Sequence, residues 1–136
     1  MSSSSELQQL IFETLTGNGA IMALANGVYD RVPTNPFGEK TAYISFGSED
    51  ANEDDAEGID GLEATTQIDI WSRAGGRVEC KNLTALVRKA LHEKELQLPT
   101  SALVEIRVVL TRIFADPDGE TTHGVVQVTA MIEEFE

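Results

Sequence analysis

Residues 62–71 read L-E-A-T-T-Q-I-D-I-W and alternate between apolar and polar side chains. The first set is Leu62, Ala64, Ile68 and Ile70, and the second is Glu63, Thr65, Gln67 and Asp69. Because successive side chains of a strand point to opposite faces, this period of two predicts a strand that packs one face on a core and leaves the other in water. Such a strand is typical of an antiparallel sheet.

Three other segments alternate in the same way. Their apolar positions are Ala42, Ile44 and Phe46 in the first, Val104, Ile106, Val108 and Leu110 in the second, and Val126, Val128, Ala130 and Ile132 in the third. Between the last two lies D-P-D-G at residues 116–119, a strong turn signal because Pro and Gly supply the backbone angles of a tight turn. We therefore expect the C-terminal third to be a long hairpin.

Two stretches have the 3.6-residue period of a helix. In the first, Ser5 and Gln8 form a capping box, residues 17–19 end the helix, and the apolar positions are Leu7, Leu10, Ile11 and Leu15. The second covers residues 77–94, and its apolar stripe is Val78, Leu83, Leu86, Val87, Ala90 and Leu91. Between the first helix and the first strand we expect a short helical turn at residues 20–25 and an extended surface connection through Pro33 and Pro36.

The predicted element order is α-β-β-α-β-β. We expect one α+β domain spanning residues 1–136, with an antiparallel sheet of roughly four strands and helices packed on one face. With 136 residues, of which 41% are hydrophobic, the chain can bury about two-thirds of its unfolded surface in a single core.

Composition excludes several classes of function. No run approaches the roughly 20 apolar residues that cross a bilayer, and residues 1–6 do not have the pattern of a signal peptide, so we expect a cytoplasmic chain without membrane contact. The single cysteine, Cys80, cannot form an internal disulfide, and without Cys or His clusters we expect no metal and no cofactor. The formal net charge of −13 opposes any role that depends on gripping DNA phosphates.

Residues 48–62 concentrate acidic side chains and contain no Lys or Arg. The acids are Glu49, Asp50, Glu53, Asp54, Asp55, Glu57 and Asp60. Like charges at this density repel one another, which predicts a flexible acidic loop. A calcium-binding EF-hand needs Gly at position six and Glu at position twelve, but a loop starting at Asp50 has Asp55 and Gly61 there. In a ring-shaped assembly, an acidic loop at the lumen or rim would repel DNA and let it slide past.

A basic stripe runs along the second helix. At about 100° per residue, Arg77, Lys81 and Arg88 fall on one side, away from the apolar positions, and His92 extends the line. The stripe is either a solvated face or a place where the acidic loop of a neighbouring copy docks. Trp71 lies on the polar side of its strand just before Arg73, and either packs under the following loop or anchors a contact between copies. The candidate subunit-interface residues are therefore Trp71, Arg73, Arg77, Lys81 and Arg88.

Residues able to support catalysis are few. A nucleophile would have to be Cys80, assisted by His92 or His123, but Cys80 lies beside the apolar stripe and is more typical of a buried thiol. Asp116 and Asp118 resemble an acid pair, yet turn formation explains both. With no nucleophile elbow, P-loop, H-E-x-x-H or G-x-G-x-x-G, we expect no enzyme activity and no catalytic residues.

Five segments occur in an order that carries further information. They are L-Q-Q-L-I-F-E-T-L at residues 7–15, V-Y-D-R-V-P at 28–33, Y-I-S-F-G at 43–47, I-D-I-W-S-R-A-G-G at 68–76 and D-P-D-G-E-T-T-H-G-V at 116–125. In this order and spacing the chain resembles the tail-completion, or tail-terminator, proteins of long-tailed bacteriophages and gene-transfer particles. The acidic loop is longer and more charged than the family leads one to expect.

The resemblance implies a structural virion protein. Similar proteins form a six-membered ring that caps the completed tail tube and then joins the tail to the head connector. The implied partners are five further copies of the chain, the tail-tube protein and the head-completion (stopper) protein, while DNA passes through without specific binding. The implied location is the head-tail junction of a virion or phage-like particle assembled in the bacterial cytoplasm.

A second class of function remains open at this stage. The chain could be a soluble, non-enzymatic binding or assembly-chaperone domain that acts as a monomer or dimer. Neighbouring genes distinguish the two classes, because a tail-tube gene and a connector gene on either side favour the ring, while an operon of metabolic enzymes excludes it.

Overall fold

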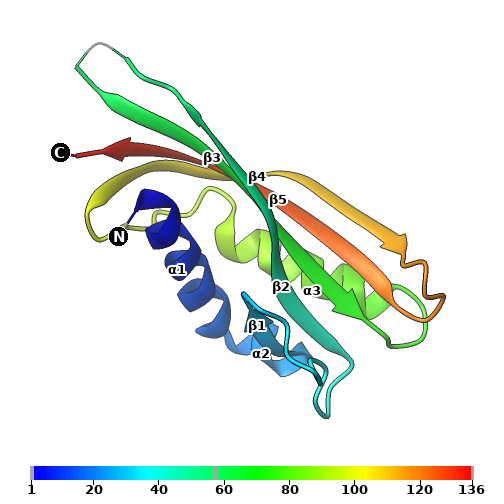
Figure 1. Ribbon diagram of the computed structural model, residues 1–136. Helices are drawn as coiled ribbons and strands as arrows, with labels where there is room; N and C mark the ends of the chain where they lie inside the picture. Colours follow the sequence, from blue (N-terminus) through cyan, green and yellow to red (C-terminus); the bar gives the residue numbers. More distant parts are fainter. Residues whose placement is uncertain (1, 57, 136) are drawn as a thin grey trace.

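The computed structural model describes residues 2–56 and 58–135. In chain order the elements are α1 (Ser3–Thr16), α2 (Gly19–Leu24), β1 (Ala25–Tyr29), β2 (Ala42–Glu53), β3 (Asp60–Ser72), α3 (Val78–Leu91), β4 (Ser101–Ala115) and β5 (Thr122–Glu134). The strands form one twisted sheet in the order β1-β2-β3-β5-β4, and the helices lie together on one face of it (Figure 1). The predicted α+β class with helices on one face is therefore confirmed.

The predicted strand count and the all-antiparallel sheet are wrong. The segment after α2 is not only a connection, because β1 pairs in parallel with β2 through Ala25↔Ala42, Val28↔Ile44 and Tyr29↔Ser45. The pairing register shifts between Ala25 and Val28, where Asn26-Gly27 interrupts the strand pattern and conceals it from sequence reading. The other pairs in the sheet are antiparallel, and the C-terminal hairpin of β4 and β5 is confirmed.

The acidic segment differs from the predicted loop. β2 continues to Glu53 and β3 begins at Asp60, with pairs such as Asp50↔Thr65 and Glu53↔Leu62, so only residues 54–59 connect the strands. Glu57 lies outside the described residues. We call the described residues of this segment, 48–56 and 58–62, the acidic arm. The strands of the arm project past the N-terminal end of α1 (Figure 1). Because successive side chains of a strand point to opposite faces, the acidic side chains of the arm are divided between the two faces of the β2–β3 hairpin. This separates their like charges and allows the two strands to pair.

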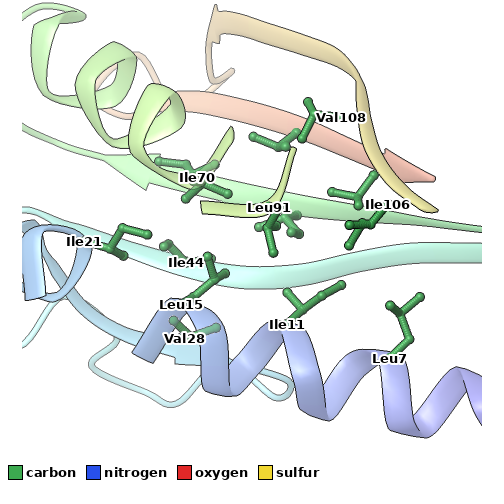
Figure 2. Packing of buried hydrophobic residues seen from close by; sticks show 14 of the residues in the cluster. Leu7, Ile11, Leu15, Ile21, Val28, Ile44, Ile70, Leu91, Ile106 and Val108 are labelled. Carbon is green, nitrogen blue, oxygen red and sulfur yellow. The ribbon is translucent and has the colours of Figure 1, made fainter. Parts of the chain in front are cut away.

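The core lies between the sheet and the helices. Figure 2 shows Leu7, Ile11 and Leu15 along one side of α1, turned toward strand residues such as Ile44. These side chains are buried, as are Ile68 and Ile70 of β3 and Leu83, Val87 and Leu91 of α3. The periodicities that predicted the strands at residues 42–46, 62–71 and 126–132 and the two long helices are thus confirmed. Val78, which was assigned to the apolar stripe, is an exception and is 69% exposed, since the helical period places it on the opposite side of α3 from the buried Val87.

Two irregularities in β4 move apolar residues out of the core. Val104 and Leu110 were predicted to face the core with Ile106 and Val108, but they are 67% and 43% exposed. The pairing with β5 shifts between Leu103 and Glu105 and again between Val108 and Leu110. Each extra residue in the strand reverses the face of those that follow, and a period of two cannot reveal where that happens.

The N-terminal helix starts earlier than predicted and is tied to the far edge of the sheet. Ser2, not Ser5, is the N-cap, and its hydroxyl oxygen accepts from the Ser5 backbone N–H at 3.0 Å. The buried Glu6 carboxylate accepts from the backbone N–H and the hydroxyl of Thr100, both at 2.7 Å. These hydrogen bonds connect the first turn of α1 to the start of β4.

Candidate assembly site

The basic stripe of α3 lies beside the free edge of β4. His92, on the same side of the helix axis as the stripe, contacts β4, where its Nδ1 accepts from the Val108 backbone N–H at 3.0 Å. On the opposite side, Leu86 and Ala90 line a surface depression with residues of α1 and α2. Helical geometry therefore places Arg77, Lys81 and Arg88, all exposed, along the β4 side of the helical layer.

Arginines of β4 extend this positive surface. We call the set Arg77, Lys81, Arg88, Arg107 and Arg112 the basic edge. Arg107 lies 3.6 Å from a Glu105 carboxylate oxygen and 4.0 Å from one of Glu93. Within residues 2–56 and 58–135, the other four have no carboxylate within 4.0 Å, so their charge is available to a partner.

His92 lies on the side of α3 that was predicted, but it does not belong to the exposed stripe. It is the C-cap of α3, with its ring turned to β4 and its side chain 20% exposed. The next residue, Glu93, donates its backbone N–H to the carbonyl of Ile106 at 2.9 Å. His92 and Glu93 thereby cover the middle of the β4 edge. Beyond Val108, β5 is the one strand of the described structure that pairs with β4, so the edge at residues 109–115 is unpaired there.

The opposite side of the sheet has an acidic edge. β1 pairs with β2 only as far as Ser45, so, among the described residues, 46–53 of β2 have β3 on one side and no strand on the other. The exposed Glu49, Asp50 and Glu53 belong to this stretch. Ser4 of α1 donates its hydroxyl to the Glu49 carboxylate at 2.8 Å and 2.9 Å. One edge of the sheet is therefore negative and the other positive.

A groove runs between α1 and the acidic edge. Its volume is about 510 Å³, and it is lined by Ser5, Gln8, Gln9, Phe12, Asp30 and Phe46. Phe12, 36% exposed, and Phe46 are its apolar lining residues. Sequence reading missed this groove, because it depends on β1 ending before β2 does.

A row of rings crosses the face of the sheet opposite the helices. It consists of Tyr29, Phe37, Tyr43, Trp71, His123 and Phe114. Trp71 stacks on His123 with centroids 3.8 Å apart and on Tyr43 at 6.1 Å, and its Nε1–H donates to the Ser45 hydroxyl at 2.9 Å. It thus packs within this row and not under the following loop. Arg73 lies 4.2 Å from the centroid of Phe37.

The ring row buries polar groups on a face predicted to be wet. Asp69, 7% exposed, lies with Oδ1 2.6 Å from Nε2 of His123, and Gln67 donates its amide to the same carboxylate oxygen at 2.9 Å. Ser45, 5% exposed, is covered by Trp71. Alternation identified the face of each residue, but it could not show that neighbouring rings shield that face.

A family model described as "Tail completion protein gp17" matches residues 9–133. The chain belongs to this family. Tail completion protein gp17 of Bacillus phage SPP1 is 25% identical over 127 residues, which cover 92% of this chain and 90% of that one. The family resemblance inferred from sequence is confirmed, and the family is one of structural virion proteins.

Two solved structures share the fold. A chain in the virion of a native gene transfer agent particle superposes with a TM-score of 0.86 at 24% identity, covering 97% of this chain and 98% of that one. The structure of bacteriophage SPP1 gp17 gives a TM-score of 0.60 at 21% identity, covering 98% and 91%. At these identities the likeness establishes the architecture.

The catalytic candidates of this tail completion protein do not come together. Cys80 is fully buried on the helix side of the sheet, close to Gly124, and burial raises the pKa of its thiol. His123 precedes Gly124 in β5, so its side chain points to the opposite face. His92 lies at the far end of α3 from Cys80. The prediction of a buried thiol is confirmed.

Asp116 and Asp118 form the turn that the sequence predicted. The Asp118 carboxylate accepts from the backbone N–H groups of Glu120 and Thr121 at 2.8 Å and from the Thr121 hydroxyl at 2.6 Å. The hydroxyl bond is the main cause of a lowered pKa for Asp118. Gly119 adopts a φ of 76°, which the turn requires and side chains disfavour.

Among the residues that the structure describes, no group of three or more His, Cys, Asp or Glu side chains is placed to hold a metal ion. Over the same residues, no helix combines the length and apolarity needed to span a bilayer.

Proposed function

We propose that this tail completion protein assembles into a closed ring of six copies that caps the finished tail tube and joins it to the head-completion protein of the connector. The ring occupies the head-tail junction of the particle. The observation that carries this proposal is the opposite charge of the two sheet edges. Glu49, Asp50 and Glu53 line one edge, and Arg77, Lys81, Arg88 and Arg112 line the other.

Opposite charges on the two edges favour a head-to-tail contact between neighbouring copies. A two-fold dimer that used either edge would bring like charges together, whereas the acidic edge of one copy complements the basic edge of the next. Repeating such a contact with a rotation closes a ring. Six copies are what the family resemblance implies, and we propose that Trp71 and Arg73 reinforce the contact from the face of the sheet.

The acidic arm suits a passage for DNA. Its strands project past the N-terminal end of α1 (Figure 1) and carry exposed carboxylates, which at the lumen or rim would repel phosphates. DNA then passes without specific binding, and the protein needs no catalytic residues for this role.

Native mass spectrometry of material taken from particles tests the ring. We expect a six-copy species, together with monomers at low concentration. If only monomers and dimers are released under conditions that preserve the tail tube, the ring proposal is wrong and the binding or assembly-chaperone alternative gains support.

Adjacent residues of α3 provide a matched pair of variants. Arg88→Glu reverses a charge of the basic edge, while Lys89→Glu reverses another exposed charge that helical geometry places away from β4. We expect Arg88→Glu to reduce both ring formation and the joining of heads to tails, and Lys89→Glu to leave both near the wild-type level. Equal effects of the two variants would mean that net charge alone matters.

A further inference from the structure

We propose that adjacent copies join by strand addition, with residues 109–115 of β4 from one copy entering the groove along residues 46–53 of β2 in the next. The sheet then continues from copy to copy around the assembly. This inference rests on the proposed ring and specifies its contact. It names the backbone groups that pair, which charge complementarity alone does not.

The two strand segments are available and similar in length. β1 ends opposite Ser45, so β2 presents unpaired backbone groups from residue 46 to residue 53. On the other side of the sheet, His92 and Glu93 occupy the β4 edge only near Ile106 and Val108. Residues 109–115 therefore offer a second unpaired row of N–H and C=O groups.

The free part of β4 has few of the features that normally protect an edge strand, namely Arg112 and the irregularity between Val108 and Leu110. Residues 108–114 read V-V-L-T-R-I-F, with strong β-forming side chains, no Pro and no Lys. Val109 and Leu110 are 55% and 43% exposed. An exposed, apolar edge of this kind pairs with unrelated chains unless a specific partner covers it.

The groove beside β2 provides apolar contacts for that partner. Phe12 and Phe46 line it, and α1 stands along it as a wall. An incoming strand would pair its backbone with β2 and extend the helix side of the sheet with residues such as Thr111, on the same side as these rings. Asp30 and the acids of β2 make the groove negative, which selects a strand that brings positive charge.

Charges match on both faces of such a continuous sheet. The pairing Glu49↔Thr66 and Glu53↔Leu62 places these two acids on the helix side, where the neighbouring copy has the Arg77, Lys81 and Arg88 stripe. Asp50, opposite Thr65, lies on the other face. Arg112 lies on that same outer face, because it pairs with Val125, which in turn pairs with Asp69. A β4-to-β4 contact would instead bring the same basic side chains together.

Engineered disulfides test the contact directly. Thr111→Cys and Ala51→Cys lie on the free edges and, by their pairing partners Val126 and Ala64, on the helix side of the sheet. Native Cys80 is fully buried and does not compete. After mild oxidation, we expect a mixture of the two single variants to give a mixed disulfide dimer, neither variant alone to dimerise, and the double variant to give a ladder of species ending at the ring.

A control on the same helix layer sets the background. Asn82→Cys is exposed on the part of α3 that points away from both edges. Strand addition is overturned if Ala51→Cys reacts with Asn82→Cys as fast as it reacts with Thr111→Cys. The same holds for Glu53→Cys, two residues further along the same face of β2. It is also overturned if Thr111→Cys forms a disulfide dimer with itself.

A pair of valine variants separates this inference from the proposed ring. Val109→Lys puts a charge in the free half of β4, and Val104→Lys puts one at a more exposed valine of the same strand outside it. We expect Val109→Lys to raise the concentration for half-assembly by about tenfold or more, with Val104→Lys near the wild type. Rings that form equally well with both variants and show no Thr111–Ala51 cross-link would disprove strand addition while leaving the ring intact. Absence of any ring from wild-type particles would instead disprove the proposed function.

Discussion

The Nδ1 atom of His92 accepts a hydrogen bond from the backbone N–H of Val108 at 3.0 Å, which fastens the end of α3 to the edge strand β4. This contact leaves the second half of β4 as the open part of the edge. His92→Ala would leave the Val108 N–H without its acceptor, and we expect a loss of about 1–3 kcal/mol in the free energy of unfolding, measured by urea denaturation. His92→Asn, whose side-chain oxygen takes the place of Nδ1, should recover part of the loss. Equal destabilisation by both variants would show that ring packing, not this bond, matters.

Glu6 predicts a pH dependence of stability. The Thr100 hydroxyl, backed by the Thr100 backbone N–H, lowers the pKa of Glu6 from its ordinary value of 4.5. A carboxyl whose pKa is lower in the folded state adds stability above its unfolded pKa, and that stability is lost as pH falls through the folded pKa. Glu6→Gln should therefore flatten the acid side of a stability curve recorded from about pH 3 to pH 7. Glu13→Gln, exposed on the same helix, should leave the curve unchanged.

Gly124 marks a close approach between β5 and α3. A Cβ at this position would lie 2.6 Å from the Thr84 hydroxyl and 3.0 Å from the Cys80 sulfur. We expect Gly124→Ala to destabilise the protein by about 1–3 kcal/mol, because the helix must move away from the sheet. Thermal unfolding of Gly75→Ala is the control, since nothing lies within 4 Å of a Cβ there. If removing the Thr84 hydroxyl in a Gly124→Ala/Thr84→Ala double variant restores nothing, the clash is not the cause.

Two substitutions of Trp71 measure how much the row of rings contributes to the free energy of unfolding. Trp71→Phe keeps an aromatic ring between Tyr43 and His123 but loses the hydrogen bond to Ser45, whereas Trp71→Ala loses both. We expect Trp71→Ala to cost more stability than Trp71→Phe by at least about 0.5–1.5 kcal/mol, the usual value of an aromatic contact. Chemical denaturation followed by far-UV circular dichroism measures both, because Trp71 is the one tryptophan of the chain and each variant removes its fluorescence.

The strands of the acidic arm should open more readily than the rest of the sheet. Residues 48–53 are exposed and have a neighbour on one side only, while residues 42–45 lie between two strands. Amide exchange of the free subunit should be faster at residues 48–53, and it should slow on assembly if a partner strand covers this edge. Strong protection of residues 48–53 in the free monomer would contradict the predicted mobility of the acidic segment.

Local patterns were sufficient for the elements whose period is unbroken. The alternation from Leu62 to Trp71 and the helical spacing of Leu7, Ile11 and Leu15 placed these side chains in the core correctly. The turn at residues 116–119 was equally readable, because Asp118 and Gly119 meet requirements that lie within the turn itself. In each case the determining interactions lie within a few residues in the chain, or follow from one buried face.

Other features depended on partners distant in the sequence. β1 is a strand because residues 42–45 lie alongside it, and Val104 and Leu110 are exposed because β4 slips twice against β5. Asp69 is buried because rings from β2, β3 and β5 meet over it, which no period along one strand encodes.

By itself, the sequence determined the α+β class, the core positions of the elements with an unbroken period, the turn chemistry and the family, since these rest on residue type and short-range spacing. Only the tertiary structure decided where the charges lie. It set the basic stripe of α3 beside the free end of β4 and the acids of β2 along the opposite edge. The physical reason is that an edge exists only where strand pairing stops, and pairing is a property of the whole sheet.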